Sequence, residues 1–186
     1  MKEVCTLEIR KIQKSDYQNI KVLYTGAFPA NERTPFRLLR KRAEQGRADF
    51  WIIREEEKSI GFAYLVTYKD LAYLFYYAID SSYRGKGYGT KALKKVMEIY
   101  KDYRLFLALE DWREESENKV QRIKRHNFYL NCGLHDLPYK LKEADVIFSI
   151  MGSGSAVEPE EYKALMNRYV SLLMKYFIDF RIIKDK

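Results

Sequence analysis

Two hydrophobic periods alternate along this chain, one typical of strands and one typical of helices. Six runs are either alternately apolar and polar or apolar almost throughout, and these strand-like runs are residues 6–12, 48–55, 59–68, 71–79, 104–110 and 144–152. The charged turn EEEK joins the second run to the third, which indicates a hairpin. A later hairpin is expected around residues 135–150.

Apolar residues at helical spacing, with start and stop signals, predict five helices, at about residues 16–27, 35–46, 88–101, 116–133 and 158–181. In the fourth helix, Ser116 is expected to cap the start and Gly133 to follow the end. Its inward stripe is predicted to be Val120, Ile123 and Leu130. The inward residues expected in the third and fifth helices are Ala92, Leu93, Val96, Ile99 or Tyr100, Leu165, Met166, Tyr169, Leu172, Leu173 and Tyr176.

The order of these elements is β-α-α-β-β-β-α-β-α-β-α. It predicts a single α/β domain over residues 1–186, built on a mixed sheet. The last helix, at about residues 158–181, is expected to be an appendage to this domain. It would support a homodimer if its apolar face is larger than one sheet can cover.

Composition narrows the class of protein. The chain has 186 residues and a formal net charge of +8, which favours an anionic partner such as nucleic acid, an acidic membrane or a phosphorylated small molecule. No run of about 18 apolar residues is present, so no membrane span is expected. Cys5 and Cys132 form no CxxC pair, and the first residues lack a signal-peptide core. These features predict a cytoplasmic protein.

One short stretch carries candidate chemistry. The sequence RGKGYGTKAL, residues 84–93, lies between a buried strand and a helix. The first N–H groups of a helix have no intrahelical partner, and the helix dipole adds positive charge there. Three glycines let phosphate oxygens approach without meeting a Cβ, and Arg84 and Lys86 add charge. The stretch is therefore predicted to bind a pyrophosphate.

Three familiar phosphate-binding loops do not fit this stretch. A P-loop needs Gly-Lys-Ser/Thr before its helix, whereas Gly87 follows Lys86 here. The GxGxxG dinucleotide fingerprint has a different spacing and follows a first strand, while this turn follows the fourth. A kinase loop joins two strands rather than a strand and a helix.

The pattern that fits is Arg-x-x-Gly-x-Gly, formed by Arg84, Gly87 and Gly89. With YYAIDSSY before it, this segment resembles the acetyl-CoA-binding segment of the GNAT superfamily of N-acetyltransferases. The sequence NFYLNCGL (127–134) resembles the family's later signature of an aromatic–Tyr pair followed by Gly-Phe, with Leu134 in place of Phe. The element order also matches over about residues 6–150. The resemblance implies a GNAT-like mixed, mostly antiparallel sheet flanked by helices, with a splayed strand pair for the coenzyme.

The resemblance also implies which residues bind acetyl-CoA as a cosubstrate. In the family, main-chain N–H groups of the glycine turn bind the pyrophosphate, and the preceding strand binds pantetheine and the acetyl oxygen. The matching residues are Tyr77, Ile79, Arg84, Gly85, Lys86, Gly87, Tyr88, Gly89 and Thr90. Relatives often bind pantetheine through an Asn seven residues before the signature Tyr. Arg122 stands at that position here, and the nearby Asn118 is the candidate substitute.

Tyr129 matches the tyrosine that commonly protonates the departing CoA thiolate in the family. A phenol with a pKa of about 10 can donate to a thiolate whose conjugate acid has a pKa of about 8.5. Packing against the coenzyme or the sheet is the alternative role. The family's strand Glu, a base in histone-type relatives, is missing because Tyr73 occupies its position. Glu110, at the end of LFLALE, is the candidate base, directly or through water, and otherwise a surface carboxylate.

Direct transfer of acetyl from acetyl-CoA to a primary amine, in a ternary complex, is the function that the resemblance implies. The acceptor pocket is expected at residues 28–39 and the late hairpin, where Glu32 is a candidate contact for a cationic amine. A small molecule and a protein amine are both open as acceptors.

Other signals are set aside. Histidines and cysteines are scattered, so no metal site is expected. Gly133 ends the helix between Cys132 and His135, which argues against a catalytic pair, and His126 is expected to be partly exposed.

Two rival functions remain open. One is a CoA-binding sensor without turnover, motivated by the missing strand Glu. The other is a nucleic-acid-binding module, motivated by the charge but disfavoured by the dispersed basic residues.

Overall fold

The computed structural model describes residues 7–143, 145–170 and 180–184. Its strands are β1 (Leu7–Lys11), β2 (Ala48–Glu55), β3 (Lys58–Tyr68), β4 (Leu71–Ile79), β5 (Arg104–Glu110), β6 (His135–Glu143), β7 (Val146–Gly152) and β8 (Phe180–Lys184). Its α-helices are α1 (Tyr17–Ala27), α2 (Phe36–Glu44), α3 (Tyr88–Ile99), α4 (Lys119–Asn131) and α5 (Pro159–Tyr169). Short 3-10 helices are η1 (Lys14–Asp16), η2 (Ala30–Glu32) and η3 (Ser81–Tyr83).

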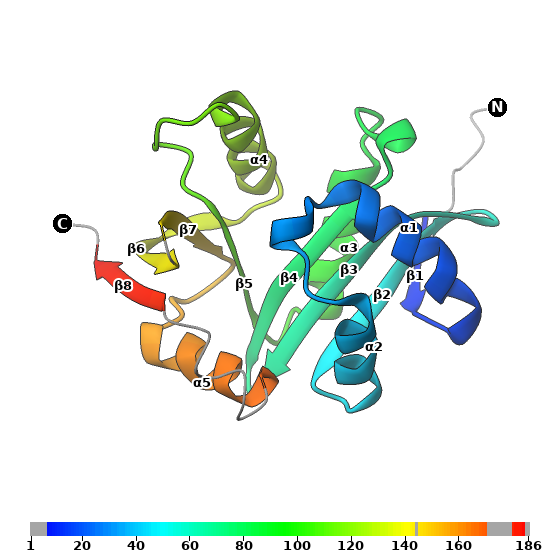
Figure 1. The fold of residues 1–186 in the computed structure, drawn as a ribbon, viewed down its shortest axis with the longest axis horizontal. Helices are drawn as coiled ribbons and strands as arrows, with labels where there is room; N and C mark the ends of the chain where they lie inside the picture. Colours follow the sequence, from blue (N-terminus) through cyan, green and yellow to red (C-terminus); the bar gives the residue numbers. More distant parts are fainter. Residues whose placement is uncertain (1–6, 144, 171–179, 185–186) are drawn as a thin grey trace. The chain divides into compact units, whose positions relative to one another are not determined.

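The strands form one mixed sheet with the order β1-β2-β3-β4-β5-β7-β6-β8 (Figure 1). β4 and β5 run parallel, and the other strand pairs whose register is described run antiparallel. The expected mixed, mostly antiparallel α/β architecture is confirmed.

The chain divides into two compact units. The first contains Met1–Val66 and Leu74–Ile99, and the second contains Thr67–Tyr73 and Tyr100–Lys186. That residues 1–186 act as a single domain stays a prediction. Each unit is described in turn below.

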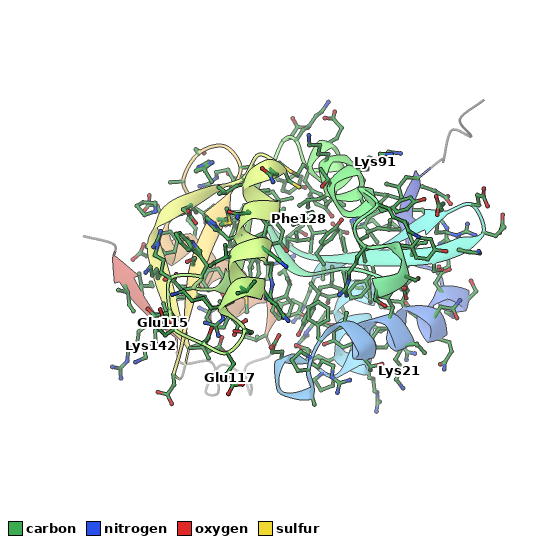
Figure 2. The ribbon with its side chains drawn as sticks, turned by 90° about the horizontal axis from the view of Figure 1, so that it is seen from above. Lys21, Lys91, Glu115, Glu117, Phe128 and Lys142 are labelled. Carbon is green, nitrogen blue, oxygen red and sulfur yellow. The ribbon has the colours of Figure 1, made fainter. Side chains whose placement is uncertain are left out.

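In the first unit, helices cover both faces of the strands. On one face, aromatic side chains from α1, α2 and the strands pack against one another, mostly in edge-to-face or tilted contacts. This aromatic cluster consists of Tyr24, Phe28, Phe36, Phe50, Phe62, Tyr64 and Tyr76. On the other face, Ala92 of α3 packs with Leu7, Ile53, Ile60 and Ile79. Figure 2 shows α1, which carries Lys21, and α3, which carries Lys91, on opposite sides of the strands.

Strands β3 and β4 approach each other closely at Gly61. A Cβ at this position would lie 2.6 Å from the carbonyl oxygen of Ala78 and 2.7 Å from Cδ1 of Ile79. These distances are shorter than real Cβ contacts, so glycine is needed here for lack of space. An isolated glycine within a strand pattern is the sequence signal for such an approach, and Gly61 was not singled out from the sequence.

In the second unit, α5 packs against the start of β5 and against Tyr73, near the start of β4. The Arg104 guanidinium donates to both oxygens of Glu161 over 2.8 and 2.6 Å and to Asp70 over 2.7 Å. The ring of Tyr73 stacks on Phe106 with centroids 4.9 Å apart and meets Tyr162 edge-on at 5.4 Å. Leu165, Met166 and Tyr169 are buried, as expected.

The expected helix over residues 158–181 is wrong at its C-terminal end. α5 ends at Tyr169, and Val170 already has an extended backbone (φ −80°, ψ 152°). Residues 180–184 form β8, which pairs antiparallel with β6 from Phe180 opposite Glu143 to Lys184 opposite Tyr139. The expected inward residues Leu172, Leu173 and Tyr176 lie outside the described residues.

The expected inward face of α4 is wrong at two of its three residues, since only Ile123 is half-buried. Val120 and Leu130 are 65% and 40% exposed, whereas His126 and Tyr129 are buried. His126, expected to be partly exposed, is buried because its polar ring is satisfied: it stacks on Trp112 at 4.8 Å, and its Nε2 lies 2.9 Å from the Asp136 carboxylate. A buried, hydrogen-bonded histidine is invisible to a pattern that counts only apolar residues.

The structure corrects the expected cap of α4 and decides between the two inward candidates at the end of α3. The N-cap of α4 is Asn118, the residue directly before Lys119, rather than Ser116. The hydroxyl of Ser116 instead donates to the Asn118 side chain over 3.0 Å. In α3, Tyr100 is buried beyond the helix end and Ile99 is 43% exposed.

Candidate active site

The glycine turn in the first unit is tied back to the strand that precedes it. Asp80 follows β4 as the N-cap of η3, and its Oδ1 accepts a hydrogen bond from the Ser82 N–H over 2.9 Å. Arg84, the first residue of the motif, donates from Nε to the carbonyl oxygen of Ile79 over 2.9 Å. The start of the turn is therefore held at a defined place relative to β4.

Two glycines of the motif adopt a backbone that favours glycine. Gly85 and Gly87 have φ values of +76° and +81°, in the left-handed region that other residues enter at a cost. A Cβ built at either position has nothing within 4 Å. Conformation rather than crowding within the protein requires glycine here, and the space around both residues is open.

Helix α3 begins directly after this turn and presents its first N–H groups there. The Lys91 N–H donates to the carbonyl oxygen of Gly87 over 3.1 Å, as the i to i−4 bond of the first helical turn. The N–H groups of Gly89 and Thr90 precede that bond, so no earlier carbonyl of the helix serves them. Such groups at a helix N-terminus bind anions.

Tyrosine side chains hold the first turn of α3 against the strands. The Tyr77 hydroxyl donates to the carbonyl oxygen of Gly89 over 2.7 Å. The Tyr88 hydroxyl bonds the carboxylate of Glu55, and its ring meets Tyr83 edge-on at 5.8 Å. The exposed ammonium of Lys86 lies 5.5 Å from the centre of the Tyr83 ring.

All the residues expected to bind the coenzyme through the turn lie in one short segment of the first unit. Residues 84–90 form the turn and the start of α3, and Tyr77 and Ile79 end β4. Ile79 is buried, and its carbonyl oxygen is the acceptor for Arg84. That the Ile79 N–H holds an acetyl oxygen stays a prediction.

In the second unit, Tyr129 lies in the last turn of α4. The helix ends just after it, in a defined pattern of main-chain hydrogen bonds. Gly133 has φ +99°, its N–H donates to Leu130, and the Leu134 N–H donates to the carbonyl oxygen of Tyr129 over 3.1 Å. This pair of bonds is a Schellman motif, with Gly133 at C′ and Leu134 at C″. The Tyr-x-x-x-Gly spacing of the signature thus has a structural reason, and Gly133 ends the helix as expected.

Burial sets the protonation of Tyr129. Its side chain is buried, and removal from water raises the pKa of its phenol to about 12. The neutral phenol is therefore the form present at ordinary pH, as a proton donor requires. This observation is equally compatible with a packing role.

Glu110 ends β5, Asn118 is the N-cap of α4, and both Asn118 and Arg122 of α4 contact the Glu110 carboxylate. Arg122 donates to Glu110 Oε1 over 2.6 Å. The other carboxylate oxygen, Oε2, lies 3.4 Å from Asn118 Nδ2 and 3.7 Å from the Arg125 guanidinium. The structure therefore brings Glu110, the candidate base, next to Asn118, the candidate pantetheine contact. It also pairs Glu110 with Arg122.

The position of the family's strand Glu is closed in this chain. Tyr73 is buried against Phe106 and Tyr162, so its side chain belongs to the core of the second unit. β4 and β5 are paired at three positions, from Leu71 opposite Arg104 to Tyr73 opposite Phe106, and both strands continue further. That they splay apart beyond these pairs stays a prediction.

Other candidate sites gain no support. Among residues 7–143, 145–170 and 180–184, no group of three or more His, Cys, Asp or Glu side chains could hold a metal ion. Within the same described part of the chain, no helix is long and apolar enough to cross a membrane. Cys132 is buried as the C-cap residue of α4.

Known proteins of similar fold share this architecture. A putative GNAT acetyltransferase from Bacteroides thetaiotaomicron is 23% identical, with 89% of this chain and 97% of that chain covered and a TM-score of 0.71. The ribosomal-protein-S18-alanine N-acetyltransferase from Escherichia coli is 17% identical over 83% of this chain and 98% of that chain, with a TM-score of 0.60. A putative streptothricin acetyltransferase from Bacillus anthracis, solved with acetyl coenzyme A, is 14% identical over 83% and 100%, with a TM-score of 0.59. No curated protein matches the chain.

The fold and the glycine turn thus define an α/β protein of the GNAT type. Residues 8–133 match the Acetyltransferase (GNAT) family, and the chain belongs to that family.

Proposed function

We propose that this protein transfers the acetyl group of acetyl-CoA to a primary amine by direct attack in a ternary complex. The observation that carries the proposal is the turn at residues 84–90, where two positive-φ glycines lead into helix N–H groups suited to an anion. Membership of the GNAT family and the acetyl coenzyme A in the Bacillus anthracis relative support the choice of coenzyme.

In this proposal the pyrophosphate is bound by main-chain N–H groups of residues 85–90, with Arg84 and Lys86 adding charge. Tyr77 and Ile79 supply main-chain contacts to pantetheine and the acetyl oxygen, and Asn118 is a further contact. These assignments follow the family resemblance residue by residue.

Tyr129 is the proposed general acid. The amine nitrogen forms a bond to the acetyl carbon, the carbon–sulfur bond breaks, and the sulfur leaves with the bonding pair. The Tyr129 phenol gives its proton to that sulfur, and the nitrogen loses one proton to a base. The phenol is protonated before each turnover, although burial raises its pKa and so makes it a weaker proton donor than an exposed tyrosine.

Glu110 is the proposed base, acting directly or through a water molecule. Arg122 donates to Oε1 over 2.6 Å, whereas Asn118 and Arg125 lie 3.4 and 3.7 Å from Oε2, so Oε2 is the oxygen proposed to receive a proton. The engagement of Glu110 by Arg122 and the closure of the Tyr73 position favour a second candidate, a protein of the same fold that binds acyl-CoA without turnover. Catalysis is the first choice because the chain belongs to an acetyltransferase family and keeps the signature tyrosine, Tyr129.

The acceptor is a primary amine of undetermined class. The Escherichia coli relative is named for an alanine of ribosomal protein S18 and the Bacillus anthracis relative for streptothricin. A peptide amine and a small cationic amine are therefore the two classes to test first.

The proposal is tested by calorimetry with CoA and by thiol release from acetyl-CoA. We expect saturable CoA binding that the Gly87→Ala variant weakens at least tenfold. Gly46→Ala is the matched control, because Gly46 also has a positive φ (+65°) and an open Cβ position but lies at the end of α2. CoA affinity unchanged by Gly87→Ala, or no CoA binding at all, would overturn the proposal.

Turnover is then measured with spermidine, an aminoglycoside, free amino acids and a peptide with an N-terminal alanine. CoA release above the amine-free rate with any of them supports the transferase. Tight CoA binding without release from the whole panel favours the non-catalytic alternative, and DNA binding that CoA does not compete with would favour the nucleic-acid reading.

A further inference from the structure

Two consecutive tyrosines of β4 send their hydroxyls to opposite faces of the sheet, as neighbouring strand residues do. The Tyr76 hydroxyl reaches the segment between α1 and α2, donating to the carbonyl oxygen of Glu32 over 2.9 Å and accepting from the Thr34 N–H over 3.0 Å. The Tyr77 hydroxyl reaches the first turn of α3, at the carbonyl oxygen of Gly89. The second of these contacts touches the proposed pyrophosphate site.

We propose that Tyr77 is a positioning residue that strengthens the grip of the Thr90 N–H on the coenzyme pyrophosphate, acting through the carbonyl of Gly89. The inference rests on the proposed function of the glycine turn. It assigns to the Tyr77 side chain a role separate from the main-chain contact expected at that residue.

The covalent structure makes this connection direct. The carbonyl of Gly89 and the N–H of Thr90 belong to one planar peptide unit, so charge withdrawn at the oxygen is felt at the nitrogen. The Tyr77 hydroxyl lies 2.7 Å from that oxygen, a short distance for a neutral O–H···O bond. A hydrogen bond donated to a carbonyl polarises the amide, and successive bonds strengthen one another by roughly 10–30% each.

The Gly89 carbonyl has room for this second donor. Its place in the first turn of α3 directs one lone pair along the helix axis toward the N–H four residues later. A carbonyl oxygen has two lone pairs, so the hydroxyl can use the other without disrupting the helix. The two hydrogen bonds then point in the same direction. The Tyr77 hydroxyl donates to the Gly89 carbonyl, and the Thr90 N–H of the same peptide unit donates to a phosphate oxygen.

The tyrosine itself is held by a rigid strand. β4 is fixed beside Tyr77 by the close approach of Gly61 to Ala78 and by burial of Ile79. Tyr77 is half-buried and packs against the cluster formed by Leu7, Ile53, Ile60, Ile79 and Ala92. The hydroxyl therefore also fixes the direction in which the Thr90 N–H points.

The test compares the wild type with Tyr77→Phe, which keeps the ring and removes the hydroxyl. From a weakening of one charge-assisted hydrogen bond by roughly 10–30%, we expect the CoA Kd to rise about 1.3- to 5-fold. In the CoA complex, the amide proton of Thr90 is expected to move upfield in the ¹H–¹⁵N NMR spectrum, because its bond to phosphate weakens. Tyr83→Phe is the matched control, since its described contacts are made by the ring.

Each result decides between named outcomes. A CoA Kd equal to that of the wild type overturns the inference, as does a weaker Kd without a change in the Thr90 amide shift, which would indicate altered packing. An equal loss in Tyr83→Phe would also overturn it. Failure of the proposed function is distinguishable, because in that case the wild-type protein itself does not bind CoA.

Discussion

The Arg122 guanidinium lies 2.6 Å from Glu110 Oε1, so one oxygen of the candidate base is already bound by a cation. Both side chains are largely buried, with 13% and 18% of their surfaces exposed. A charge-assisted hydrogen bond at this depth contributes about 1.5–3 kcal/mol to stability. Glu110 therefore has a structural role whether or not it takes a proton.

Glu110→Gln separates these two roles when compared with Arg122→Gln. If Glu110 is the base, Glu110→Gln lowers kcat by about 10²–10⁴, since a positioned base contributes about that factor. Arg122→Gln breaks the same ion pair but leaves the carboxylate, so its kcat is expected to stay within tenfold of the wild type. Equal losses in the two variants, measured by thiol release with an active amine, would reject the base role.

Tyr129→Phe tests the acid role. The variant keeps the ring and the Schellman turn but cannot protonate a thiolate, so kcat is expected to fall by about 10²–10⁴ while the CoA Kd changes less than threefold. Phe128→Leu, on the same helix turn, is the control for packing. A Tyr129→Phe enzyme with wild-type kcat would assign the residue to packing alone.

The buried phenol of Tyr129 also predicts a loss of stability in alkali. Its pKa is about 12 when folded and about 10 when unfolded, so between these values the unfolded state binds fewer protons. Stability from this group is complete below about pH 10 and declines as pH rises toward 12, by about 2–3 kcal/mol in total. Urea unfolding at pH 9 and pH 11.5 should show a smaller decline for Tyr129→Phe than for the wild type.

The close approach at Gly61 predicts opposite effects for two glycine substitutions. Gly61→Ala places a Cβ against the backbone of β4 and is expected to destabilise the protein by about 2 kcal/mol or more and to weaken CoA binding. Gly26→Ala in α1 meets nothing within 4 Å and is expected to stabilise by about 0.5–1 kcal/mol. Thermal unfolding of both variants checks the pair, and equal melting temperatures would contradict it.

The fastening of α5 to β5 predicts a loss of stability in acid. Arg104 holds the pKa of Glu161 and of Asp70 below their ordinary values through hydrogen bonds. Stability from these carboxylates is present above about pH 4.5 and is lost as pH falls through their lowered folded-state pKa values. The difference in melting temperature between wild type and Arg104→Gln should therefore shrink from pH 7 to pH 3.

Much of the fold could be predicted from the sequence because most elements have strong local signals. The ranges 48–55, 71–79 and 104–110 agree with β2, β4 and β5 at both ends. The glycine turn was predictable as well, because Gly85 and Gly87 need the backbone freedom that their residue type supplies.

The remaining features depend on tertiary contacts. The burial of His126 depends on Trp112 and Asp136, which are 14 and 10 positions away in the chain and are brought together only by the fold. β8 is missed by the sequence prediction, in which the last helix extends to its first two residues, Phe180 and Arg181. Only the pairing with β6 makes FRIIK a strand. The hydrogen bond from the Tyr77 hydroxyl to Gly89 could not be predicted from the sequence. The chain has sixteen tyrosines, and nothing in the sequence singles out Tyr77 as the partner of that carbonyl.

The opposite directions of Tyr76 and Tyr77 limit how β4 can vary in length. A single residue inserted or deleted between Leu71 and Tyr76 would move each hydroxyl to the other face of the sheet. The segment at Thr34 and the first turn of α3 would then lose their anchors together. Insertions and deletions in this strand should therefore be tolerated far less than substitutions, and a deletion scan for CoA binding would show this as a sharp gap over 71–77.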